Sequence, residues 1–394
     1  MSRPLRIAFV CPYPAGAVLP PGDIRQRYRG REHAAPWVRA LSGALARRPE
    51  IELRLFVDTR SVRQRHRVIH EGVDITFLPR WEPYRLDPYH GHWPATLRVR
   101  RALADFQPDL VQGFGTEGAH GVVAARMPWP NVVFIQGIVE ACAQHHGFPL
   151  HRRAVLQALE RRTVRRTNGL IAETCFARDW ALRVKPEALV RIIPHGSNPE
   201  FFAARPAFAE KRIAVVGSLF PLKGVDTALR ALVGAADPDT RLIFIGQGYE
   251  RENLVRLAGE LGLANRVDFL GQLPRADIIR ELERARALLI ASRVDTSPNV
   301  ITEAHACGLP VIGTAAGGIP DMIEDGRDGY LAPVDDHAAL ARHMDRLIAE
   351  PALARHMGQA GREKVRVLND PDRIAALHLD LYRTVLERRP GATR

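Results

Sequence analysis

The sequence predicts an α/β protein of two doubly wound, Rossmann-like domains. Short apolar runs bounded by turn residues alternate with helical patterns, as in βαβ units that build a parallel sheet. The chain has 394 residues, 46% of them hydrophobic, which is more than one hydrophobic core normally organises. A stretch of prolines and polar residues at 198–212 separates the two sets of predicted strands. We therefore expect a first domain over residues 1–202 and a second over 203–370.

The expected strands are short runs rich in Val, Ile, Leu and Phe. They cover residues 6–11, 51–57, 74–79, 110–114, 132–136, 169–173 and 190–194 in the first half, and 212–218, 241–246, 267–271, 287–292 and 310–314 in the second. Helical periodicity fills the intervals, most clearly in residues 36–48, 225–235, 250–262 and 371–388. Because open α/β sheets bind ligands at the carboxyl ends of their strands, we expect a ligand cleft between the two domains.

The excess positive charge lies in the first half of the chain. Residues 1–200 hold 30 Lys+Arg against 18 Asp+Glu, whereas residues 201–394 hold 26 of each. A one-sided basic domain attracts an anionic partner, such as membrane lipid or a phosphorylated acceptor, although arginine-rich solvated helix faces explain the same count. A nucleic-acid partner is not expected, because the chain has no recognised motif for reading bases.

Cysteine spacing and hydropathy point to a cytoplasmic protein. The cysteines at 11, 142, 175 and 307 are too far apart for a C-x-x-C pair or a dense disulfide framework, which favours a reducing compartment. The apolar run near the N-terminus is too short for a signal peptide, and no run reaches the length of a membrane span. Membrane contact is expected only as peripheral binding at the inner face. The composition excludes disordered, collagen-like and small disulfide-rich classes.

The segment 287–323 has the densest set of chemically useful residues. A strand is expected to end at Ser292, and a helix to begin near Val300 with Glu303 in its first turn. Free N–H groups at the start of a helix bind anions, and Asp295 in the preceding loop can face the same ligand as Glu303. A helix-capping loop followed by an acidic first turn explains the same spacing without a ligand.

This segment resembles the donor-site signature of retaining GT-B glycosyltransferases of family four. The string ASRVDTSPNVITEAHACGLPV places Asp295 and Glu303 on the two acids of that signature. The resemblance implies that Asp295 lies beside the donor sugar and that Glu303 accepts hydrogen bonds from the ribose hydroxyls. It also implies that backbone amides around Ser297, Asn299 and Val300 hold the diphosphate. Asp295 is one methylene shorter than the usual Glu.

Two more segments resemble the same family. In RIAVVGSLFPLKG, Lys223 matches the lysine that neutralises the leaving diphosphate, and Ser218 stands where an arginine is common. In LIFIGQGYERENL, Gly246 matches the second strand-to-helix turn. A dinucleotide-binding fingerprint has a third glycine at the position of Arg251, so this chain is not expected to bind NAD.

The segment VDFLGQLPRADI resembles the loop that holds the edge of the donor base through backbone groups. The resemblance implies that Leu270, Gly271 and Leu273 supply those groups. The closing segment LNDPDRIAALHLDLYRTVLER resembles the family's last helix, so residues 371–390 are expected to cross back onto the first domain.

The first domain resembles the family less closely. The loop after the first strand offers Gly22 or Gly30 for close approach to phosphate. At the position of a histidine that contacts the donor sugar in many members, the chain has Gln136, which cannot act as a general base. This substitution favours a front-face mechanism that relies on positioning and charge stabilisation. His33, His120 and His145 are acceptor-side candidates.

The sequence predicts neither a metal nor a cofactor other than the donor substrate. The two D-x-D strings, at 237–239 and 370–372, contain proline and are expected to be turns. The resemblance as a whole implies a retaining transferase that moves a hexosyl unit from a nucleotide-diphosphate sugar to a hydroxyl acceptor, in bacterial polysaccharide or glycoconjugate biosynthesis. An epimerase of sugar nucleotides and a non-catalytic nucleotide-sugar-binding protein are the alternatives.

Overall fold

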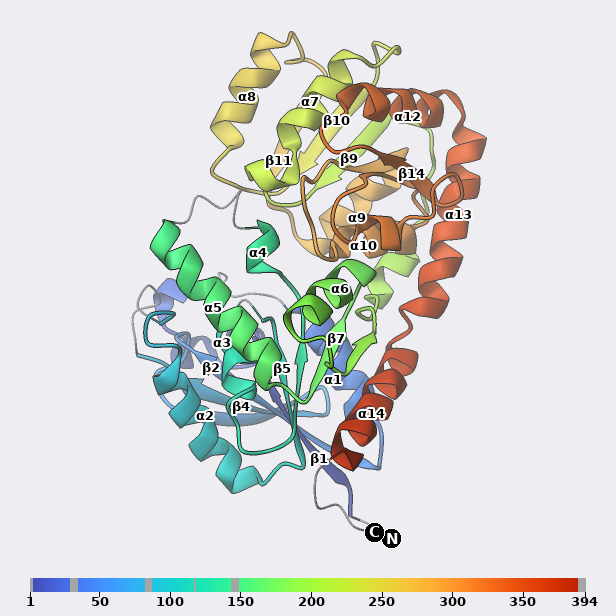
Figure 1. Ribbon diagram of the computed structural model, residues 1–394. Coiled ribbons are helices and arrows are strands. Elements are labelled where there is room, and N and C mark those ends of the chain that lie inside the picture. The colour runs from blue at the N-terminus through green and yellow to red at the C-terminus, as the bar shows by residue number, and fades with distance from the viewer. Residues whose placement is uncertain (1–2, 29–34, 82–86, 117, 143–148, 389–394) are drawn as a thin grey trace. The chain divides into compact units, whose positions relative to one another are not determined.

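The computed structural model describes residues 3–28, 35–81, 87–116, 118–142 and 149–388. These residues form two compact units. Unit 1 contains the described residues up to Gly196 together with those from Pro371 onward, and unit 2 runs from Ser197 to Asp370. In Figure 1 the N-terminal elements are blue and the helix α14 (Pro371–Glu387) is red, and both belong to unit 1.

Unit 1 is built on one eight-stranded sheet within the described part of the chain. Its strand order is β3 (His66–His70), β4 (Val73–Pro79), β2 (Ile51–Thr59), β1 (Leu5–Val10), β5 (Leu110–Phe114), β6 (Asn131–Phe134), β7 (Gly169–Ala172) and β8 (Val190–Ile192). The strands are parallel except β3, which pairs antiparallel with β4.

Both faces of this sheet are covered, which explains its continuous apolar strands. Ile7 and Phe9 pack with α1 (Pro36–Ala46) and α14 on one face. Ala8 and Val10, on the other face, pack with α2 (Trp93–Phe106), α3 (Ala119–Ala124) and α6 (Cys175–Val184). Two further helices, α4 (Val139–Cys142) and α5 (Leu150–Arg166), lie between β6 and β7 in the chain.

Unit 2 has one six-stranded sheet whose strands are all parallel. The order is β11 (Val267–Gly271), β10 (Arg241–Ile245), β9 (Arg212–Val216), β12 (Ala287–Ile290), β13 (Val311–Thr314) and β14 (Gly329–Ala332). The helices are α7 (Val225–Val233), α8 (Arg251–Glu260), α9 (Arg275–Arg284), α10 (Asn299–Cys307), α11 (Ile319–Met322), α12 (His337–Ala349) and α13 (Pro351–Leu368). One continuous apolar core joins sheet and helices.

Each sheet changes direction of winding at one point, as in doubly wound folds. In unit 2 the change falls between β9 and β12, which are neighbours in the sheet although β10 and β11 separate them in the chain. In unit 1 it falls between β1 and β5. Loops that leave adjacent strands in opposite directions open a crevice at this point, so a ligand site is expected at the loops after β9 and β12.

The predicted α/β class is confirmed, but two strands were not expected. The edge strand β3 has the sequence HRVIH, in which only Val68 and Ile69 are apolar, so it lacks a longer apolar run. The strand β14 is only four residues long and begins with glycine. In addition, α10 begins at Asn299, so the expectation that Glu303 lies in the first helical turn was wrong. Among the described residues, no helix is long and apolar enough to cross a membrane.

Candidate functional site

A lysine and an aspartate meet at the switch point of unit 2. Lys223 ends the short 3-10 helix Pro221–Lys223 after β9, and Asp295 lies in the loop after β12. The Lys223 Nζ donates a hydrogen bond to Asp295 Oδ2 at 2.5 Å. Their side chains are 30% and 14% exposed, so most of each side chain is buried while a ligand can still reach the pair from solvent. The structure thus brings together two of the residues that the sequence analysis assigned to the donor site.

The backbone on both sides of this pair leaves no room for a side chain. Gly224 follows Lys223 at φ +59°, and a Cβ there would lie 1.9 Å from the Ala291 carbonyl oxygen. Gly317, in the loop after β13, has φ +56°, and its Cβ would lie 2.0 Å from the Asp295 carbonyl oxygen. That oxygen accepts a hydrogen bond from Gly318 N at 2.8 Å. The loop carrying Asp295 is therefore held between its two neighbours by main-chain contacts.

The loops after β9 and β10 are packed in the same way. A Cβ at Gly246 would lie 1.9 Å from the Gly217 carbonyl oxygen, and one at Gly248 would lie 2.1 Å from that of Leu219. Leu219 N donates to the Gln247 carbonyl oxygen at 3.0 Å. The structure therefore gives Gly246 a definite role in loop packing, and Ser218 is exposed in the neighbouring loop.

Arg293, which was not predicted from the sequence, fixes the loop leading to Asp295. Its guanidinium donates to the Pro221 carbonyl oxygen at 2.6 Å and to both carboxylate oxygens of Asp226, at 3.0 and 2.8 Å. It also forms an ion pair with Asp335 at 2.9 Å. The hydrogen bond from Arg293 to Asp226 outweighs partial burial and raises the pKa of Arg293 above its usual value. No local pattern marks this residue, because its partners come from distant parts of the chain.

The remaining donor-side candidates lie on the loops and helix starts that follow the strands of unit 2. Ser297 Oγ lies 3.7 Å from Met322 Sδ, and no side chain caps the first turn of α10, which begins with Asn299 and Val300. Glu303 is half-buried in α10. At the end of β11, Leu270 is 39% exposed and Gly271 has φ +73°, while Leu273 is half-buried just beyond.

The unit 1 candidates are separate from one another in the chain. Gln136 is half-buried two residues after β6 ends, and His120 is half-buried in α3. Gly22 lies in the exposed 3-10 helix Pro21–Asp23, where a Cβ would meet nothing within 4 Å, so the backbone there makes no close approach within unit 1. Gly30, His33 and His145 lie outside the described residues.

A buried carboxylate beneath the Gln136 loop was also not predicted. Glu160 on α5 is fully buried. Its Oε1 accepts a hydrogen bond from Val139 N at 3.0 Å and one from Thr116 Oγ1 at 3.3 Å. Glu160 thus ties the loops that follow β5 and β6 to one helix. A lone Glu in the arginine-rich sequence of α5 looks like a surface residue, which is why the sequence does not reveal it.

The acidic D-x-D strings are engaged in ion pairs. Lys211 Nζ lies 2.7 Å from Asp237 and 3.3 Å from Asp239, and Asp372 lies 2.7 Å from Arg47. In the part of the chain that the structure describes, no three His, Cys, Asp or Glu side chains are grouped so that they could hold a metal ion.

Two protein-family models match consecutive parts of the chain. Residues 198–364 match the model described as glycosyl transferases group 1, and residues 34–201 match the model described as glycosyltransferase family 4. Together the two matches take in every candidate of unit 2 and both Gln136 and His120 of unit 1.

Curated relatives match over shorter regions. The chain is 30% identical over 179 residues to N-acetyl-alpha-D-glucosaminyl L-malate synthase of Bacillus anthracis, covering 45% of the chain and 46% of the relative. It is 38% identical over 152 residues to D-inositol 3-phosphate glycosyltransferase of Mycobacterium sp. (strain KMS), covering 37% of the chain and 34% of the relative. The matched regions span less than half the length of these relatives.

Solved structures share the fold over nearly the whole chain. Sucrose-phosphate synthase from Thermosynechococcus elongatus superposes with a TM-score of 0.79 at 21% identity, over 98% of this chain and 100% of the other. Anabaena HepE in complex with UDP-glucose superposes with a TM-score of 0.71 at 18% identity, over 96% of this chain and 100% of the other. Both likenesses concern the arrangement of sheets and helices.

Proposed function

Because the chain belongs to the group 1 glycosyltransferases of family 4, with their GT-B fold, we propose that it is a retaining glycosyltransferase. It would move a hexosyl unit from a nucleotide-diphosphate sugar to a hydroxyl acceptor. The observation that carries the proposal is the Lys223–Asp295 pair at the switch point of unit 2, between glycine-packed loops. The Anabaena protein, whose structure contains UDP-glucose, supports the donor class.

Lys223 is the group proposed to receive the diphosphate. Its ammonium group lies at the switch point, and a bound diphosphate would compete with Asp295 for the hydrogen bonds that this ammonium donates. Asp295 would then be free to accept hydrogen bonds from hydroxyls of the donor sugar. The uncapped start of α10 offers backbone N–H groups to the same anion, and Glu303 in the next turn is assigned to the ribose.

The proposed reaction takes place on one face of the sugar. The bond between C1 and the diphosphate oxygen breaks while the acceptor oxygen bonds to C1 from the same side, and the acceptor proton passes to the departing phosphate oxygen. Lys223 stabilises the negative charge that grows on the diphosphate. Gln136 contributes hydrogen bonding in unit 1 and no proton transfer. This scheme assigns no step to a metal ion.

An anionic acceptor is the second part of the proposal. Residues 1–200 carry the whole net positive charge of the chain. The names of two relatives contain anionic compounds, L-malate and D-inositol 3-phosphate. A phosphorylated or carboxylated acceptor used in bacterial polysaccharide or glycoconjugate biosynthesis would fit this charge.

A donor screen followed by product analysis tests the proposal. We expect one family of UDP, GDP or ADP sugars to raise the melting temperature, and mass spectrometry to detect a hexosylated product with anionic acceptors. The anomeric configuration of the product, read by NMR, should equal that of the donor. Stabilisation without hydrolysis or transfer would instead identify a nucleotide-sugar-binding protein, and inversion would contradict the retaining mechanism.

A further inference from the structure

Unit 1 contains a pocket at the edge of its sheet opposite to the Gln136 loop. The pocket has a volume of about 540 Å³, within the usual range for small-molecule sites. It opens where two parallel strands begin, because Asn131 is the first residue of β6 and Asn168 directly precedes β7. Gln136 lies five residues further along the β6 segment, roughly 15 Å away at the rise of an extended strand.

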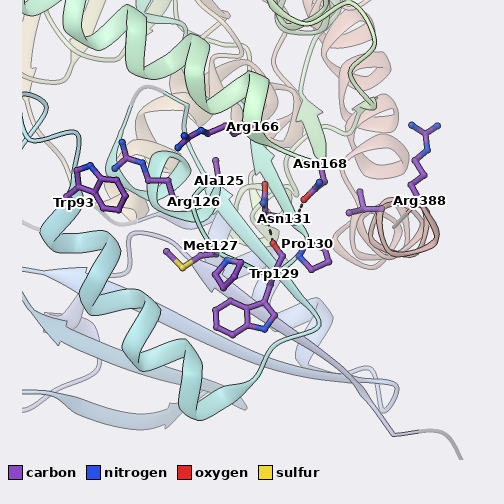
Figure 2. A pocket seen from close by; sticks show the side chains of 12 residues that line it. Trp93, Ala125, Arg126, Met127, Trp129, Pro130, Asn131, Arg166, Asn168 and Arg388 are labelled. Atoms are coloured by element: carbon purple, nitrogen blue, oxygen red, sulfur yellow. Dashed lines mark hydrogen bonds between the residues drawn. The ribbon is translucent and has the colours of Figure 1, made fainter. Parts of the chain in front are cut away.

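The sequence between α3 and β6 builds the floor of this pocket. Pro128 and Pro130 lie in the loop of turns and bends that follows α3, with Trp129 between them. Asn131 N then donates to Asn168 Oδ1 at 3.0 Å, and Thr167 Oγ1 donates to Asn131 Oδ1 at 2.8 Å. Figure 2 shows this floor between the two strand starts. The pocket is thus supported by a hydrogen-bonded frame.

Three arginines line the pocket, and none of its lining residues is acidic. They are Arg126 after α3, Arg166 at the end of α5 and Arg388 after α14. Figure 2 shows Arg126 and Arg166 near Trp93, with Arg388 at the other end. Within the described residues, no carboxylate lies within ion-pair distance of these three guanidinium groups. Among the described residues, folding therefore gathers positive charge here without a carboxylate partner.

One of these arginines is partly withdrawn from water and held in a fixed orientation. Burial, followed by the charges of Arg166 and Arg162, lowers the pKa of Arg126 below its usual value. Its guanidinium lies over the Trp93 ring at 4.7 Å and donates to the Gly91 carbonyl oxygen. A guanidinium that is already oriented loses little conformational entropy when it binds an anion.

We propose that this pocket binds the phosphate group of an organic phosphate. Arg126 and Arg166 supply the paired donors that phosphate oxygens prefer, and Trp93 and Trp129 supply aromatic surface for the organic part. The proposal does not depend on the transferase reaction, because the pocket is at the opposite edge of the sheet. The phosphate can belong to a soluble ester or to a phospholipid headgroup.

Phenyl phosphate titration tests the site in solution. The full-length Lys223→Ala chain is used, so that phosphate binding at the proposed donor site does not contribute. We expect saturable binding by calorimetry, tighter than that of inorganic phosphate because of the tryptophans. Arg166→Gln should weaken binding at least about tenfold, the loss expected for one charge-assisted hydrogen bond.

The matched control is Arg165→Gln. Arg165 is an exposed neighbour on the same helix but does not line the pocket, so phenyl phosphate binding should change by less than about twofold. Arg126→Lys, which keeps the charge and loses the planar fork, should weaken binding as well. Absence of saturable binding, or equal losses in Arg165→Gln and Arg166→Gln, would overturn the proposal.

Vesicle co-sedimentation distinguishes the two sources of phosphate. Phosphatidylcholine vesicles with and without phosphatidylglycerol are mixed with three chains: the wild type, Arg165→Gln and Arg166→Gln. Binding to the anionic vesicles that falls with salt and is lost only in Arg166→Gln identifies a lipid headgroup. Saturable phenyl phosphate binding together with equal vesicle binding of all three chains identifies a soluble phosphate.

Discussion

The two units are both doubly wound, but the functional edges of their sheets are held together differently. In unit 2, glycines at 224, 246 and 317 let backbone lie against backbone. In unit 1, one such contact lies after β5, where a Cβ at Gly121 would lie 2.1 Å from the Gly115 carbonyl oxygen. There the buried side chain of Glu160 also joins the loops after β5 and β6. An edge packed through its backbone thus depends on glycines near each strand end, whereas an edge packed through side chains depends on residues distant in sequence.

The largest effect is expected at the switch point of unit 2. Lys223→Ala should lower the rate of transfer by about 10²- to 10³-fold, since it removes a charge that stabilises the developing anion. Steady-state turnover with the identified donor measures this effect. Lys211→Ala is the control, because Lys211 is an exposed lysine that pairs with Asp237 and Asp239 away from the switch point. Activity of Lys223→Ala within a few-fold of wild type would contradict the assigned role.

Acid should destabilise both units through buried histidines. Burial lowers the pKa of His305 in unit 2 to about 4, and in unit 1 it lowers the pKa of His92 to about 4 and that of His378 to about 3. The unfolded chain binds a proton near pH 6.5 and the folded chain does not, so the free energy of unfolding falls as pH drops below 6.5. By pH 4 the loss should be about 3 kcal/mol for each histidine.

Urea unfolding between pH 7 and pH 4 measures this loss. His305→Gln and His378→Gln should each lower the free energy of unfolding at pH 7 and reduce its pH dependence in the unit that carries the change, with His92 leaving part of that dependence in unit 1. An unchanged pH dependence in either variant would show that its histidine is not the group that titrates.

Gly317→Ala tests whether backbone packing holds the Asp295 loop. Alanine at φ +56° is strained, and its Cβ would contact the Asp295 carbonyl oxygen, so we expect the free energy of unfolding of unit 2 to fall by about 2–3 kcal/mol. Gly259→Ala in α8 is the control, since a Cβ there meets nothing within 4 Å and alanine favours a helix. Equal effects of the two replacements, measured by urea unfolding, would refute the packing argument.

Glu160→Gln is the corresponding test in unit 1 and should have the smallest effect. The amide oxygen can still accept from Val139 N, so we expect a loss of about 1–2 kcal/mol and faster hydrogen exchange over α4. Glu140→Gln, which alters an exposed carboxylate paired with Arg161, is the control. Unchanged exchange at Val139 in the Glu160 variant would mean that the carboxylate does not hold this loop.

The sequence predicted the parts of the molecule whose signals are local. Apolar runs identified the buried parallel strands. The segments around Lys223 and Asp295 were singled out by their resemblance to family signatures, and in the structure both lie in loops that follow neighbouring strands of unit 2. Arg293 and Glu160 were not predicted, because each acts through partners that only folding brings near. The strands β3 and β14 were missed because β3 has only two apolar residues and β14 is very short.

The return of α14 to unit 1 has a consequence for synthesis on the ribosome. Unit 2 is a single stretch of chain, Ser197–Asp370, and can fold once that stretch has emerged. Unit 1 must wait, because Tyr382 and Leu381 of α14 complete its core, and Tyr382 donates a hydrogen bond to Gln112 Oε1 at 2.5 Å. Unit 2 is therefore expected to fold first, while one face of the unit 1 sheet stays uncovered until α14 has been translated.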